Sequence, residues 1–173
     1  MNKYEIARNA KIAQYSASVN DDGAAGRVFE LECAAPNSRK TAVAKQGAVD
    51  VYINYGGGHV AAECKTNGGR IESLYHAKAP RFVIYRMDWT QKHTAGKTTA
   101  AWEEKRYIEP RVIPTDLFLA TLERIGAIKS TNGKNPERAI QVSSKRFYEW
   151  LLDYPITYTP GMNYTADDFE GLE

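Results

Sequence analysis

Apolar residues recur three or four positions apart in four segments of the chain, which is the spacing of one face of an amphipathic helix. These segments cover about residues 2–17, 24–35, 115–125 and 143–153. Asp22 can cap the second helix, and Pro36 prevents its continuation because proline lacks the backbone N–H that a helix interior needs. The pattern therefore predicts two helices before the central part of the chain and two after it.

Alternation of apolar and polar residues predicts strands between these pairs of helices. Residues 48–55 alternate, three glycines follow, and residues 59–65 alternate again, which is the pattern of a β-hairpin. Residues 81–87 and 106–113 predict two further strands. The connection before residue 81, which includes a short predicted helix over 71–77, is long enough for a parallel crossover.

This order of elements predicts an α/β fold with a mixed central β-sheet flanked by helices. We expect one domain over residues 1–154, with a core at about 24–113 and C-terminal helices at 114–154. Within it, residues 88–105 form a polar excursion that predicts a flap. Residues 155–173 are acidic and rich in tyrosine and proline, and they predict a tail that is either wrapped around the domain or mobile.

With 173 residues and 43% hydrophobic residues, the chain can build a single core without disulfides or a structural metal. No apolar run approaches the ~18 residues that a membrane span needs, and the first residues lack the apolar stretch of a signal peptide. We therefore expect a cytoplasmic protein with no membrane partner. Cys33 and Cys64 lack the spacing of a metal or redox motif, which favours free thiols in a reducing compartment.

The charges are distributed unevenly, although 23 Lys and Arg nearly balance 21 Asp and Glu. Residues 36–106 hold twelve basic and six acidic residues, whereas the two ends together are acidic. A basic centre favours a polyanionic partner, and a solvated surface with a chance excess of charge is the alternative. The lysines and arginines predicted to contact nucleic acid are Arg39, Lys40, Lys45, Arg70, Lys78 and Lys97. Trp102, Trp150 and the tyrosines of the tail are predicted to be packing residues.

Glu63 and Lys65 carry the candidate chemistry. Alternation along the second strand of the hairpin places both on one face and Cys64 on the other, so we expect Glu63 and Lys65 to face outward. A carboxylate holds a divalent cation, and a neighbouring lysine orients water and offsets negative charge, which is the chemistry of metal-assisted phosphodiester hydrolysis. Asp50, at the start of the partner strand, can supply a second carboxylate. Two such residues on one strand also make an ordinary ion pair, which is the structural alternative.

The register of the hairpin decides whether Asp50 shares their face. A two-residue turn at Gly57-Gly58 places Asp50 opposite Lys65, and a four-residue turn also keeps the three side chains together. A three-residue turn without a bulge places Asp50 opposite Cys64 and divides the site between the two faces.

Asp50, twelve intervening residues and then Glu63-Cys64-Lys65 resemble the signature of the PD-(D/E)XK nuclease superfamily, the restriction-endonuclease-like fold. The spacing is similar to that of archaeal Holliday junction resolvases, and the resemblance covers residues 24–87. It departs from that pattern at Val49, where the superfamily has proline. The resemblance implies that Asp50 and Glu63 bind Mg²⁺ or Mn²⁺ together with the backbone carbonyl of Cys64. It also implies that Lys65 serves the attacking water and that a helical acid, Glu30 or Glu32, completes the site.

The function implied by this resemblance is a Mg²⁺-dependent endodeoxyribonuclease that acts as a homodimer on DNA. The small size suits a nuclease of branched DNA, of a phage or of a mobile element. The alternative is a nucleic-acid-binding or protein-interaction domain that keeps the fold without cleaving.

Two other kinds of site, a phosphate loop and a zinc site, are excluded. Gly96-Lys97-Thr98 has Gln91 where a phosphate loop requires glycine, and the three histidines lie too far apart for a zinc site.

Overall fold

The computed structural model describes residues 3–16, 24–34, 49–130 and 138–173. Its helices are α1 Lys3–Ser16, α2 Ala24–Cys33, α3 Thr115–Arg124 and α4 Lys145–Asp153, with 3₁₀ helices η1 Glu72–Tyr75 and η2 Ala166–Phe169. Its strands are β1 Val51–Tyr55, β2 Gly58–Thr66, β3 Phe82–His93, β4 Trp102–Pro114, β5 Ile128–Ser130, β6 Arg138–Ile140 and β7 Asn163–Tyr164. None of the described helices has the length and apolar character needed to cross a membrane.

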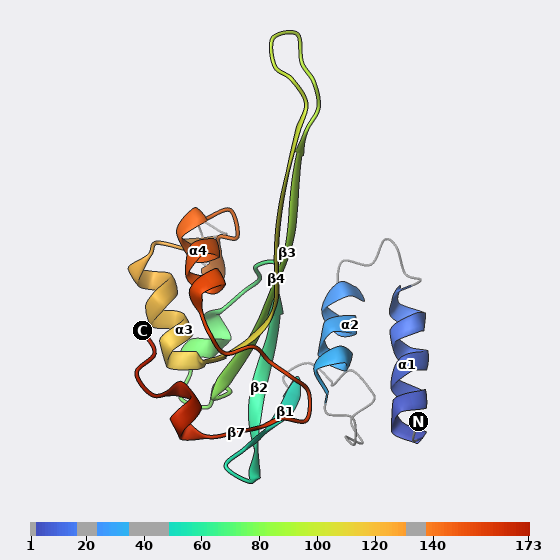
Figure 1. Ribbon diagram of the computed structural model, residues 1–173, viewed down its shortest axis with the longest axis vertical. Coiled ribbons are helices and arrows are strands. Elements are labelled where there is room, and N and C mark those ends of the chain that lie inside the picture. The colour runs from blue at the N-terminus through green and yellow to red at the C-terminus, as the bar shows by residue number, and fades with distance from the viewer. Residues whose placement is uncertain (1–2, 17–23, 35–48, 131–137) are drawn as a thin grey trace.

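The central sheet has five strands in the order β4-β3-β2-β1-β7, and helices lie on both of its faces (Figure 1). The β1–β2 and β3–β4 pairs are antiparallel, whereas β2–β3 and β1–β7 are parallel. The prediction of an α/β fold with a mixed sheet flanked by helices is therefore confirmed. The predicted crossover between β2 and β3 is also confirmed, since it carries η1 and joins two parallel strands.

Alternation along β3 divides the core into two parts, one on each face of the sheet. Phe82 and Ile84 pack with Phe29 of α2, and Figure 1 shows α1 lying beyond α2 on that side. Val83 and Tyr85 face the opposite way and pack with residues of α3 and α4. The side chains of all four β3 residues are at most 2% exposed, so the centre of the sheet is covered on both faces.

The turn of the β1–β2 hairpin is Gly56-Gly57, between the paired residues Tyr55 and Gly58. Both glycines have positive φ, +58° and +82°, as a two-residue type I′ turn requires, and only glycine adopts such angles without steric cost. The turn therefore lies one residue earlier than the predicted Gly57-Gly58. Because the turn is still two residues long, the ladder keeps Asp50 in step with Glu63 and Lys65, but its continuation places Asp50 opposite Glu63 and not opposite Lys65 as predicted.

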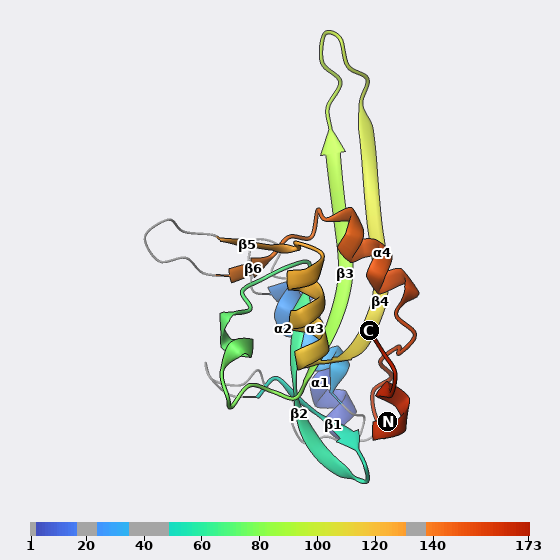
Figure 2. The ribbon, with the colours of Figure 1, turned by 90° about the vertical axis from the view of Figure 1, so that its left-hand side faces the viewer.

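The β3 and β4 strands continue together beyond the body of the protein as a long two-stranded arm, residues 88–107 (Figures 1 and 2). Pairs run from Asp88 opposite Tyr107 to His93 opposite Trp102, and residues 94–101 at the tip are exposed. The polar excursion predicted over residues 88–105 is thus a paired extension of both strands. A polar sequence suits this position, because no other described element covers either face of the outer arm.

Residues 155–173 wrap along the sheet beside β1 (Figure 1). The backbone of β7 pairs with β1, and Tyr158 and Tyr164 are buried among residues of β1, β2 and β3. Trp150 of α4 donates a hydrogen bond from Nε1 to the backbone carbonyl of Glu173 at 3.1 Å. Of the two forms left open for the tail, the structure shows the wrapped one.

Candidate active site

Asp50 lies directly before β1 and is tied to β2 by its side chain. Its Oδ2 accepts a hydrogen bond from the backbone N–H of Cys64 at 2.8 Å. In a strand the N–H and C=O of one residue point to the same side, so the Cys64 carbonyl also faces the edge where Asp50 lies. Continuing the β1–β2 ladder by one pair from Val51 and Ala62 places Asp50 opposite Glu63.

Glu63 and Lys65 form an ion pair, with Lys65 Nζ 3.1 Å from Glu63 Oε1. The register of β2 with β3 places Glu63 beside Val83 and Lys65 beside Tyr85, on the face of the sheet that α3 and α4 cover. Their side chains are only 21% and 15% exposed, respectively. The prediction that they face outward is therefore wrong, because β2 lies inside the sheet and both of its faces are covered.

The loop after β2 encloses Lys65 further. A Cβ atom added at Gly69 would lie 3.9 Å from Cδ of Lys65, so the loop passes close to the lysine stem. The preceding Gly68 donates its backbone N–H to the hydroxyl of Tyr85 at 3.2 Å, which holds the loop to β3. The burial of Tyr85 raises the pKa of its phenol above the ordinary value, so the hydroxyl stays neutral. Lys65 is thus placed by packing as well as by Glu63.

Glu30 approaches from the other face of the sheet, on α2. Burial raises the pKa of the Cys64 thiol, and the contact with Cys33 and the charges of Asp50 and Glu30 raise it further. The effect of both carboxylates on one thiol places Asp50 and Glu30 near Cys64. Glu63, in contrast, points to the opposite face from Cys64.

Glu32, the second helical candidate, is engaged elsewhere. Its Oε2 lies 3.3 Å from Nη1 of Arg86 on β3, and its side chain is 46% exposed. The Arg86 guanidinium also lies over the ring of Phe29, 4.5 Å from the ring centroid, so this arginine holds α2 against the sheet. Of the two acids on α2, Glu30 is therefore the one that lies toward Asp50.

The structure ties Asp50 to the backbone of Cys64 and pairs Glu63 with Lys65 on the same strand, on the face that α3 and α4 cover. Glu30 lies on α2, on the other side of Cys64. In the described part of the chain, no three His, Cys, Asp or Glu side chains form a group that could hold a metal ion. Mg²⁺ usually keeps several water ligands and takes one or two carboxylates from the protein, so Asp50 and Glu63 are a sufficient pair by chemistry. Two carboxylates of this kind have the ligand chemistry that a hard divalent cation prefers.

The predicted nucleic-acid contacts are separated in space. Arg70 and Lys78 are exposed on the crossover between β2 and β3, and Lys97 is exposed at the tip of the arm. Arg39, Lys40 and Lys45 lie outside the described residues. Of the six predicted contacts, the three described ones therefore lie on two separate parts of the structure, the crossover and the tip of the arm.

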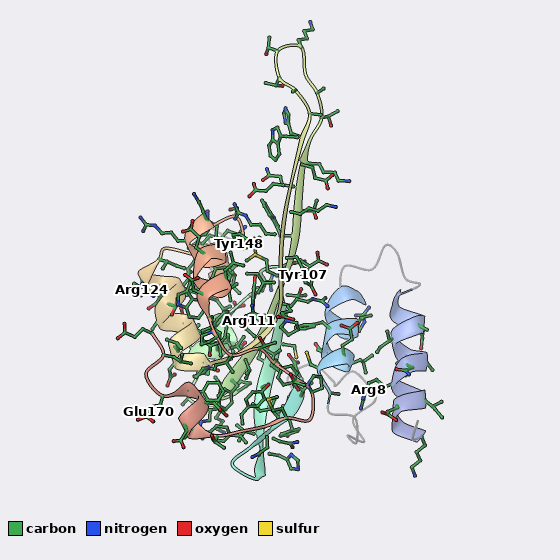
Figure 3. The ribbon with its side chains drawn as sticks, viewed as in Figure 1. Arg8, Tyr107, Arg111, Arg124, Tyr148 and Glu170 are labelled. Carbon is green, nitrogen blue, oxygen red and sulfur yellow. The ribbon has the colours of Figure 1, made fainter. Side chains whose placement is uncertain are left out.

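The sequence analysis did not identify the residues that anchor the base of the arm or those that lie next to its tip. Trp102 is 47% exposed and stacks on His93 with ring centroids 5.6 Å apart, so the prediction that it is a packing residue is wrong. Arg106 is 9% exposed and holds the root of the arm, where Figure 3 shows Tyr107 and Tyr148. One signal was present in the sequence, because no Asp or Glu occurs between Trp89 and Trp102.

The chain was compared with protein-family models, with curated proteins and with solved structures. It matches no protein-family model, no curated protein and no solved structure. The likeness to the PD-(D/E)XK superfamily therefore rests on Asp50, Glu63 and Lys65 in their hairpin and on Glu30 in the helix before it.

Proposed function

We propose that this protein is a Mg²⁺-dependent endodeoxyribonuclease built on a restriction-endonuclease-like core. The observation that carries the proposal is the anchoring of the Asp50 carboxylate to the backbone of Cys64, next to the ion pair of Glu63 and Lys65. These side chains are held by a tight glycine turn, by strand pairing and by burial. They are therefore positioned before any substrate arrives, which is what catalysis requires of them.

Asp50 and Glu63 are the residues that would hold Mg²⁺, with the Cys64 carbonyl at the same edge. Glu30, on the other side of Cys64, would reach the ion through water. When bound, Mg²⁺ supplies Lewis-acid activation of the scissile phosphate and of the attacking water. Because Glu63 contacts Lys65, an ion held by Glu63 would lie near the lysine ammonium group.

Lys65 has the geometry of a water-orienting and charge-stabilising residue. Its ammonium group is directed by Glu63 and its stem is enclosed by the loop at Gly69, so it cannot swing freely into solvent. A fixed positive charge in a partly enclosed site stabilises the negative charge that develops on the phosphate. Water attacks phosphorus and the bond to the 3′ oxygen breaks, leaving a 3′ hydroxyl and, by analogy with the superfamily, a 5′ phosphate.

The substrate and assembly follow from the same analogy. The excess of basic residues over residues 36–106 matches the charge of a DNA backbone, and Arg70 and Lys78 are exposed on the crossover that follows the catalytic strand. Cleavage of both strands needs two active sites, so we expect a homodimer. A branched DNA is the preferred candidate substrate.

A second function is favoured by the ion pair itself. Glu63 is already neutralised by Lys65, and Glu30 lies on the opposite face of β2, which is also the arrangement of a protein that keeps the fold and binds DNA without cutting it. The two functions differ in one result, the fate of bound DNA in the presence of Mg²⁺.

The experiment is incubation of the protein with supercoiled plasmid and with a four-way DNA junction. We expect nicked and linear products that carry 5′ phosphates in Mg²⁺ or Mn²⁺, and intact DNA in EDTA. Asp50→Asn, prepared identically, controls for a contaminating nuclease and is expected to be inactive. Intact DNA in both metals with salt-sensitive binding supports the second function, and intact DNA without binding contradicts both.

A further inference from the structure

The outer half of the β3–β4 arm has no function in the proposed catalysis. Residues 94–101 are exposed, and Figure 3 shows side chains projecting from both sides of the arm far from the helices. A two-stranded ribbon is marginally stable alone in water, so an extension of this length is expected to lie against a partner.

The arm is held firmly where it leaves the body. The Arg106 guanidinium lies 4.7 Å from the ring centroid of Trp89 and 5.4 Å from that of Tyr148 on α4. Its Nη1 donates to the backbone carbonyl of Ser143 at 3.1 Å, and its Nε donates to Glu104 at 2.9 Å. These contacts fix the direction in which the ribbon leaves the sheet.

The chemistry of the outer arm suits a polyanion. Between Trp89 and Trp102 there is no acidic residue, while Lys92, Lys97, His93 and four threonines are present. Beyond this stretch, Glu103 lies 3.1 Å from Lys105 and 3.6 Å from Lys92, and Asp88 adds one negative charge at the root of the arm. At Lys97, no ion pair is found among the residues that the structure describes. The outer arm therefore carries a positive field with hydroxyl and ammonium donors.

A second copy of the chain is the less suitable partner. The core of a homodimer interface is depleted in charge and rich in large apolar side chains. The tip, residues 94–101, has no side chain larger than alanine among its apolar residues, and Trp102 is the one large apolar group next to it. With such small side chains the ribbon is narrow at its tip and offers little apolar surface to a second copy of the chain.

The length of the arm matches the scale of duplex DNA. Lys65 pairs with Tyr85, and eight residues separate Tyr85 from His93 along β3. At about 3.3 Å per residue, the paired ribbon extends roughly 26 Å from the level of the lysine to His93, where the tip begins. One turn of B-DNA is about 34 Å long, and its major groove, about 12 Å wide, admits a two-stranded ribbon.

From these observations we propose that the arm is a duplex-binding ribbon that enters the major groove within one helical turn of the phosphate cut at Asp50, Glu63 and Lys65. Lys92 and Lys97 contact phosphates across the groove, and the stacked His93 and Trp102 pack against the sugars and base edges. The proposal rests on the proposed function, since it assumes that DNA is bound at the candidate active site.

The test is a shortened arm in which Asn-Gly replaces residues 91–104 and joins Thr90 to Lys105, which face each other in the ladder. The contacts of Arg106 with Trp89, Tyr148 and the Ser143 carbonyl stay and only its pair with Glu104 is lost, so the melting temperature is expected to change little. Hydroxyl-radical footprints on duplex DNA in metal-free buffer are expected to lose several base pairs on one side, and affinity to fall at least tenfold.

A point variant tests the same contact without rebuilding the hairpin. Lys97→Ala is expected to reduce the slope of log affinity against log salt by about 0.9, the value for one phosphate contact. Lys129→Ala, an exposed lysine on β5, is the matched control and is expected to leave the slope unchanged.

The outcomes separate the arm from the catalytic function. A shortened arm with an unchanged footprint and affinity overturns the arm proposal and leaves the nuclease proposal standing. Loss of dimer mass by light scattering with an unchanged footprint assigns the arm to a second copy of the chain and likewise overturns it. A wild-type chain that leaves no footprint and cuts no DNA overturns both proposals.

Discussion

Replacing Lys65 by alanine is expected to lower the single-turnover rate of DNA cleavage at least about 100-fold, with DNA affinity nearly unchanged. The lysine is 15% exposed and contacts Glu63, so it adds little to the outer surface that holds the DNA backbone. Its charge acts instead where the phosphate becomes more negative during the reaction. The measurement is the cleavage rate with enzyme in excess, together with the dissociation constant in metal-free buffer.

The control for this prediction is Lys129→Ala, which removes a positive charge from an exposed position and is expected to keep the wild-type rate. Melting temperatures are needed for both variants, because removal of Lys65 leaves the half-buried Glu63 without its partner and costs some stability. A folded Lys65→Ala protein that cuts DNA at the wild-type rate contradicts the catalytic role. If the variant is folded and its rate falls only because it no longer binds DNA, Lys65 has a role in binding and not in catalysis.

Replacing Phe147 by alanine is expected to lower the free energy of unfolding by about 3–5 kcal/mol. The ring is 0% exposed and contacts two other aromatic rings, those of Tyr85 at 5.2 Å and Phe118 at 6.4 Å between centroids. These three residues join α4, β3 and α3, so the variant leaves a cavity where the helices meet the sheet. Urea unfolding followed by far-ultraviolet circular dichroism measures the loss.

Leu152 provides the matched control, because it lies on the same helix but is 49% exposed. Leu152→Ala is expected to change the free energy of unfolding by less than about 0.5 kcal/mol. A loss below about 1 kcal/mol for Phe147→Ala would show that this aromatic cluster does not hold α4 to the sheet as described.

Much of the fold could be predicted from the sequence because its elements carry local signals. The start of α4 shows this, since the helix predicted from residue 143 begins at Lys145, directly after Ser144, whose Oγ accepts the backbone N–H of Phe147 at 3.4 Å. The outer arm carried no such signal. Period-two alternation marks strands with one buried face, whereas both faces of the arm are polar. The short strands β5 to β7 have two or three residues each, too few to show a period.

The pairing of the strands that carry the candidate residues could be predicted from the sequence, whereas the burial of those residues could not. The spacing of Asp50 and Glu63 and the glycines between them implied that the two strands pair, and the I′ turn fixed the register. The burial of Glu63 and Lys65 depends instead on Tyr85 and the helices that pack against that face, which are distant in sequence. The choice of Glu30 over Glu32 likewise depended on Arg86, whose ion pair with Glu32 no local pattern reveals.

Anomalous diffraction from crystals grown with duplex DNA and Mn²⁺ tests the central claim most directly. The proposed nuclease site predicts a manganese peak about 2.0–2.4 Å from carboxylate oxygens of both Asp50 and Glu63, beside the Cys64 carbonyl and next to a phosphate of the DNA. Glu30 is expected within one water molecule of the ion. Bound DNA with no manganese at Asp50 and Glu63, or with manganese held only elsewhere, would contradict the claim.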